Sequence, residues 1–257
     1  MKIPITGVSG VINRVLAVVL EGDSDRLTFE RAFTLLLRER SPNDSLQVFV
    51  FRGDLTINDE NGDPIDSNDV LQNLIDFLSH ELRTYGLYPR DLLGVIHISD
   101  LDAVYCNQER VCYANQRRLS YDLDRKLVLT RNVVATLQRN ERKRDALTTL
   151  MRTKALEFSY QGWLEVPYRL FYVGINLEHA FYGLANCDFS EKESLSLDFD
   201  QSHASTADIW SDFVRSLPYF GENYEESCRY ARMEEHAFER MSNLRFVEDF
   251  LNDLLSK

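Results

Sequence analysis

The chain lacks any apolar run long enough to cross a membrane, which takes about 20 residues. Its longest run, residues 15–20, has the length of a single strand. The N-terminus also lacks the extended apolar core of a secretory signal, since Pro4 and Gly7 interrupt it. We therefore expect a cytoplasmic protein that makes no membrane contact.

Metal-binding cysteine motifs and a positive net charge are missing too. The four cysteines form no CxxC pair and no zinc-like spacing, so free thiols are expected. A net charge of -12 argues against coating nucleic acid by charge alone. Residues 107–170, however, hold 13 Lys and Arg against 7 Asp and Glu. This basic segment either binds a polyanion locally or forms a solvated helix face, because Arg and Lys are also good helix formers.

Carboxylates follow two apolar runs that are typical of buried strands. Residues 92–96 lead into Asp100 and Asp102, and residues 15–20 lead into Glu21 and Asp25. The carboxyl ends of parallel strands share one edge of a sheet, where α/β proteins bind ligands. Carboxylates grouped there repel one another and favour a hard divalent cation. The pattern predicts a phosphoryl-transfer site that uses Mg²⁺ or Mn²⁺.

Hydrophobic periodicity predicts a strand–helix–strand–helix–strand unit, over residues 15–20, 26–40, 46–51, 67–85 and 92–98. A fourth strand over residues 168–175 brings Glu178 to the same edge. Residues 107–162 read as a basic helical insertion without strands, and residues 189–205 as a loop. Helices are expected over residues 206–217 and 222–255. The predicted fold class is α/β, a mostly parallel sheet flanked by helices. A catalytic domain over residues 1–180 would carry an acidic helical region, residues 181–257, packed on it.

Glu21-Gly22 after the first strand and Asp100-Leu101-Asp102 after the third resemble the Toprim domain of topoisomerases, bacterial primases and several nucleases. The turn from Glu21 to Asp25 looks more like the nuclease branch, which includes OLD-type nucleases and RloB-like anti-phage proteins. The resemblance covers residues 14–105 and extends to residue 180 through the fourth strand.

The resemblance implies a Mg²⁺- or Mn²⁺-dependent endonuclease that cleaves DNA or RNA. Asp100 and Asp102 would chelate the metal, Glu21 would be a ligand or the general acid/base, and Asp25 and Glu178 would be further ligands. The expected nucleic-acid contacts lie in the basic segment: Arg117, Arg118, Arg142, Lys143 and Arg144. Family likeness also implies an effector of bacterial antiviral defence. An ATPase sensor would be a separate chain, because GxxxxGK[ST] is absent here.

Other readings of the same residues stay open. The aspartates could fill a turn, and an acid at position 25 is favoured by the helix dipole. A DxD after a strand also occurs in nucleotide-sugar glycosyltransferases, where it binds Mn²⁺ and a diphosphate, but this leaves the turn at Glu21 unexplained. A Toprim-shaped module that only binds a partner is the third possibility.

Overall fold

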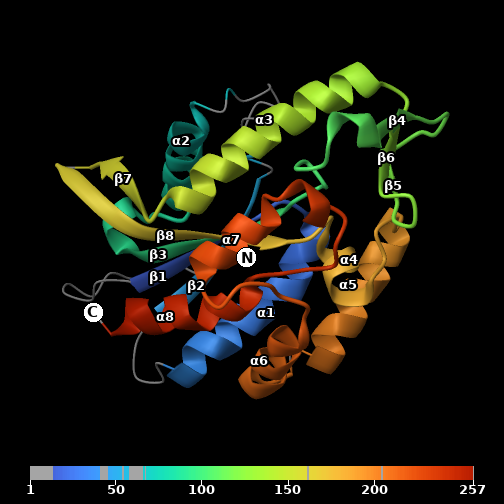
Figure 1. Cartoon of the computed structure of the whole chain (residues 1–257). Helices are drawn as coiled ribbons and strands as arrows, with labels where there is room; N and C mark the ends of the chain where they lie inside the picture. The colour runs from blue at the N-terminus through green and yellow to red at the C-terminus, as the bar shows by residue number, and fades with distance from the viewer. Residues whose placement is uncertain are drawn as a thin grey trace.

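A mostly parallel sheet forms the centre of the molecule (Figure 1). The computed structural model describes residues 14–40, 46–53, 55–57, 66, 68–160, 162–203 and 205–256. Within these ranges the strand order is β2-β1-β3-β8-β7, with bounds β1 (Arg14–Leu20), β2 (Leu46–Arg52), β3 (Leu92–Asp100), β7 (Ala155–Ser159) and β8 (Trp163–Val173). The first four strands of this order run parallel, and β7 pairs antiparallel with β8 at the edge. The predicted α/β class with a mostly parallel sheet is confirmed.

Helices cover both faces of this sheet. In Figure 1, α1 (Asp23–Arg40) and α8 (Val247–Leu255) lie on one side, and α2 (Val70–Thr84) and α3 (Val133–Arg152) on the other. Because β1 is covered on both faces, every residue from Val15 to Leu20 is buried. The buried residues of α2 recur every three or four positions: Val70, Leu74, Phe77, Leu78 and Leu82. The predicted strand–helix alternation is therefore confirmed from β1 to β3.

The segment from residue 107 to 162 is only partly helical, so its prediction as a strandless helical insertion is wrong. It holds a second sheet of order β4-β6-β5, with β4 (Val111–Tyr113), β5 (Ser120–Asp122) and β6 (Leu127–Thr130). The helix α3 and the strand β7 follow. Strands of three or four residues are too short for alternation to stand out from the sequence. The next strand, β8, begins at Trp163 rather than at residue 168.

The C-terminal region is built from short helices. They are α4 (Leu177–Tyr182), α5 (Phe189–His203), α6 (Ala207–Ser216) and α7 (Tyr224–Ala231), with the 3₁₀ helices η3 (Glu234–His236) and η4 (Leu244–Phe246). Two further 3₁₀ helices lie earlier in the chain, η1 (Pro89–Asp91) and η2 (Gln108–Arg110). The predicted loop over residues 189–205 is wrong: it is α5, which packs with α6 against α1. The predicted helix over residues 222–255 is interrupted, since Ser242 forms a bridge with Val173 of β8. At the end of the chain, α8 packs on β3 and β8.

Two simpler expectations concern cysteines and membranes. All four cysteines are free, as expected, and Cys106 and Cys228 are buried. In the part of the chain that the structure describes, no helix combines the length and apolarity that a membrane span requires. Residues 1–13, including the N-terminal segment used in the sequence argument and the start of the predicted 1–180 domain, lie outside the described residues.

Candidate functional site

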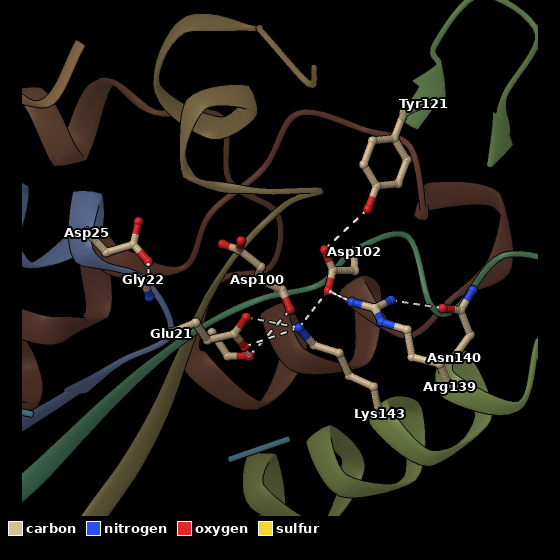
Figure 2. Close-up of polar contacts among 10 residues, drawn as sticks. Glu21, Gly22, Asp25, Asp100, Asp102, Tyr121, Arg139, Asn140 and Lys143 are labelled. Atoms are coloured by element: carbon tan, nitrogen blue, oxygen red, sulfur yellow. Dashed lines mark hydrogen bonds and ion pairs between the residues drawn. The ribbon is translucent and has the colours of Figure 1, made fainter. Parts of the chain in front are cut away.

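The carboxyl edge of the parallel sheet brings the predicted carboxylates together (Figure 2). Leu20 of β1 pairs with Ile98 of β3, so Glu21 lies beside the end of β3. There the Ser99 hydroxyl donates a hydrogen bond to Glu21 Oε1, and Asp100 is the last residue of the strand. The parallel register of β1 and β3 therefore fixes the relative positions of Glu21 and Asp100.

A buried lysine joins two of these carboxylates. Lys143 of α3 is 0% exposed, and its Nζ lies 3.0 Å from Glu21 Oε2, 3.1 Å from Glu21 Oε1 and 2.7 Å from Asp102 Oδ2. Lys143 was predicted as a nucleic-acid contact, and the structure buries its ammonium between two carboxylates. Lys143 lies on the buried face of α3, in the helical series Asn140, Lys143, Ala146, Leu147 and Leu150. A lysine at a position where the helical spacing places apolar residues was the sequence signal for a buried cation.

Asp102 reaches the lysine because the chain turns sharply after β3. Asp102 has a φ of 50° and Ala103 a φ of 53°, a left-handed conformation that costs on the order of 1–2 kcal/mol per residue. The Asp102 amide donates to the Ile175 carbonyl at 3.0 Å, which holds this turn against the segment that follows β8. The backbone between Asp100 and Asp102 is therefore not extended, and the two side chains take different directions.

Three side chains bind the Asp102 carboxylate: besides Lys143, Arg139 Nη2 lies 2.5 Å from Oδ2, and the Tyr121 hydroxyl donates to Oδ1 at 3.2 Å. Burial by itself would raise the pKa of Asp102, but Lys143 and Arg139 outweigh it and hold that pKa well below its usual range. Asp102 is therefore an ionised carboxylate with its own protein cations.

Tyr121 reaches the site from β5 of the second sheet. Its backbone is held by Asn186, which accepts from the Tyr121 amide and donates to the Tyr121 carbonyl, both at 2.8 Å. Burial and then the charge of Asp102 raise the pKa of Tyr121 well above its usual value, so the phenol stays a hydrogen-bond donor. No local pattern distinguishes Tyr121 from the other tyrosines among the 12 of the chain.

Asp100 differs from Asp102, because no side chain of the described residues forms an ion pair with its carboxylate. Its side chain receives no hydrogen bond from the described residues. In Figure 2 its carboxylate points away from the Lys143 ammonium, toward the side where Asp25 lies. Burial first, and then the charges of Glu21, Asp25 and Asp102, raise the pKa of Asp100 well above its usual value. A bound cation would lower the cost of ionising this group.

Asp25 and Glu178 lie beside the cluster with partners of their own. Asp25 Oδ2 accepts a hydrogen bond from the Gly22 amide at 2.9 Å, the helix-start role that the sequence analysis left open. Glu178 of α4 is 2% exposed and pairs with Lys192 Nζ at 2.8 Å, while its Oε1 is buried without a hydrogen-bond partner among the described residues. Burial opposes the charge of Lys192, but Glu178 and then Asp100 and Asp25 raise its pKa. Lys192 was missed because its helix, α5, was predicted as a loop.

The other predicted basic contacts lie outside the cluster. Arg117 and Arg118 are exposed between β4 and β5. Arg142 and Arg144 flank Lys143 on α3 and are half-buried. None of the four forms an ion pair with the clustered carboxylates in the described residues. Their role in nucleic-acid binding stays a prediction.

Among the described residues, no three His, Cys, Asp or Glu side chains converge as a ready-made metal site. In this arrangement the Lys143 ammonium occupies the position between Glu21 and Asp102 that a bridging cation would take. The site thus consists of the carboxylates paired with Lys143 and of Asp100, whose carboxyl receives no hydrogen bond from the described residues. Comparison of the chain with models of protein families, with curated proteins and with solved structures finds no match.

Proposed function

We propose that this protein is a divalent-metal-dependent nuclease with its centre at Glu21, Asp100 and Asp102. The observation that carries the proposal is Asp100, a buried carboxyl at the ligand-binding edge of a parallel sheet whose pKa is raised by burial and by three other carboxylates. Perturbed acids grouped at such an edge are typical of functional sites. Oxygen donors of this kind suit Mg²⁺ or Mn²⁺.

The ion would be held by Asp100, with further oxygens from the predicted ligands Glu21, Asp25, Asp102 and Glu178. When bound, such an ion neutralises phosphate oxygens and lowers the pKa of a water ligand. Lys143 holds both Glu21 oxygens and so fixes the orientation of the candidate general base. Arg139, a quarter exposed, is the cation of the cluster best placed to meet a phosphate that arrives from solvent.

The finer assignments rest on the resemblance described above. They are a Toprim-like catalytic unit, a DNA or RNA substrate held along the basic segment, and a role in antiviral defence with a separate ATPase. The parallel order β2-β1-β3 and the position of Glu21 beside the end of β3 support the first of these. The Lys143 contacts favour the alternative that the chain is a non-catalytic binding module, because an internal cation already neutralises Glu21 and Asp102.

The test compares wild type with Asp100→Asn and with a matched control, Asp212→Asn, whose side chain is 83% exposed. Plasmid DNA, single-stranded DNA and tRNA are incubated with Mg²⁺, Mn²⁺ or EDTA, and Mn²⁺ binding is measured by calorimetry. We expect metal-dependent cutting that Asp100→Asn reduces about a hundredfold or more and that Asp212→Asn leaves intact.

Two outcomes would overturn the proposal. Cutting that survives Asp100→Asn would place the chemistry elsewhere in the chain. Mn²⁺ binding that depends on Asp100, without cutting of any of the three substrates, would assign the cluster to the non-catalytic module.

A further inference from the structure

A cavity in which five of the ten lining residues are Arg or Lys lies where the end of α3 meets α7 and β8. Its volume is about 280 Å³, at the lower end of the range for small-molecule sites. The charged residues that line it are Arg152, Lys154, Arg169, Arg229, Arg232 and one carboxylate, Glu225. The whole chain has 41 Asp and Glu against 29 Lys and Arg, so this local excess of positive charge opposes the overall balance.

These cations have one carboxylate, Glu225, beside them in the cavity lining. Within the described residues none of the five forms an ion pair with a carboxylate. Cys228 also lines the cavity, but burial raises the pKa of its thiol to about 11, so it adds no negative charge. Grouped positive charges repel one another, and a bound anion would relieve that repulsion.

Arg169 is the best indication that the cavity binds a ligand. Its Cζ lies 4.8 Å from the ring centroid of Tyr224 and 5.0 Å from that of Phe250, so aromatic rings hold the guanidinium in place. Stacking uses the faces of a guanidinium and leaves the N–H groups at its edge available. Among the described residues, these N–H groups have no hydrogen-bond acceptor. Such a half-buried, oriented donor group suits a phosphate.

Favourable positions at helix ends explain only some of the cations that line the cavity. Arg152 and Arg229 lie in the last turns of α3 and α7, where a cation is favoured by the helix dipole. Arg232 donates from Nε to the Cys228 carbonyl at 3.1 Å, which is also a helix-end contact. Arg169 lies in the middle of a strand, so this explanation does not apply to it.

We propose that this cavity binds the phosphate groups of a small phosphorylated ligand, of the size of a mononucleotide or a short polyphosphate. The arginines supply bidentate donors for phosphate oxygens, and Lys154 adds a further positive charge. Arg152 lies nine residues beyond Lys143 on α3, about 13 Å along the helix, so the cavity is separate from the carboxylate cluster. The proposal does not depend on nuclease activity.

The test is calorimetry on the full chain in EDTA, which keeps metal-bound nucleotide out of the carboxylate cluster. The probes are pyrophosphate, ATP and a single-stranded oligodeoxynucleotide. Wild type is compared with Arg152→Gln/Arg229→Gln, two exposed positions of the cavity, and with Arg38→Gln/Arg131→Gln, two exposed positions outside it. Thermal unfolding of each variant, without and with pyrophosphate, shows that it is folded and whether the ligand stabilises it.

We expect saturable binding of pyrophosphate or ATP at one site, weakened at least tenfold by the cavity variant and unchanged in the control. Added salt should weaken the binding, since it is an attraction between charges. Absence of saturable binding for both small probes would overturn the proposal, as would equal affinity in the cavity variant. Binding of the oligonucleotide alone, lost in the cavity variant, would also overturn it and assign the cations to a nucleic-acid strand.

Discussion

Replacing the buried lysine tests whether the carboxylate cluster depends on an internal cation. In Lys143→Met the apolar stem of the side chain is kept while the ammonium is lost. The side chains of Glu21 and Asp102 are only 11% and 15% exposed, and both would keep their negative charges without the lysine. Breaking a buried ion pair from one side typically costs about 3–5 kcal/mol, because the remaining charge stays buried without its partner. For a chain of this size that corresponds to a fall in Tm of roughly 6–20 °C.

The measurement is urea and thermal unfolding in EDTA, with Lys126→Met as the control. Lys126 is exposed, so its replacement should change the free energy of unfolding by no more than about 0.5 kcal/mol. Adding Mg²⁺ or Mn²⁺ should restore part of the loss in Lys143→Met, because a divalent cation can take the place of the ammonium between the carboxylates.

A double variant separates charge from packing. In Lys143→Met/Glu21→Gln the negative charge that Lys143 opposed is removed as well, so we expect about 1–3 kcal/mol of the loss to be recovered. If the double variant is no more stable than Lys143→Met, the lysine matters through packing and not through its charge. A loss below about 1 kcal/mol in Lys143→Met itself would refute the reasoning altogether.

Three further predictions concern the scaffold. Burial, and then the charge of Lys143, lower the pKa of His97 to about 3. Below pH 6.5 the unfolded chain therefore binds a proton that the folded chain does not, so stability falls by about 2 kcal/mol by pH 5. His97→Gln should remove this part of the slope in urea titrations, and an unchanged slope would contradict it. Gly221→Ala should cost about 1–3 kcal/mol, because φ is +91° and the new Cβ would lie 2.6 Å from the Ser227 amide nitrogen. Gly86→Ala, with a φ of +72° and open space, should cost less in the same denaturation assay; the reverse order would show that the steric argument fails. Asn176→Ala should cost about 1–2 kcal/mol, because Asn176 accepts from the His179 amide at 2.8 Å and caps α4. Unfolding curves that coincide with wild type would contradict this role.

Hydrophobic patterning was sufficient to identify a helix or strand whose burial follows one simple rule along its whole length. The strand β1 is buried on both faces and α2 on one, so a continuous apolar run and a helical spacing identify them. The edge position of Glu21 and Asp100 followed from that alternation. Patterning failed for α5, where Ser196 and Phe199 are the buried residues, because the stability of this helix comes from packing on α1.

The residues that complete the site are harder to find from the sequence. Lys143 and Arg139 approach from α3, and Tyr121 from a three-residue strand, across tertiary contacts that no local pattern encodes. The left-handed turn at Asp102 and Ala103 is held by the segment that follows β8, far along the chain, and neither residue is a glycine that would indicate it. The sequence therefore indicates the carboxylates, while Lys143 was predicted only as a nucleic-acid contact and Arg139 was not singled out.

The contact between Glu21 and Lys143 spans 122 positions of the chain, and this has a consequence for folding. Strands β1 and β3 can pair before α3 is in place, and at that stage Glu21 lies beside the end of β3 without the lysine that later joins it to Asp102. A βαβαβ unit that forms before α3 docks would thus hold these acids without Lys143, a repulsion that acidic pH or added cations should relieve. Docking of α3 supplies the missing charge, so this step should be late, cooperative and sensitive to ionic strength.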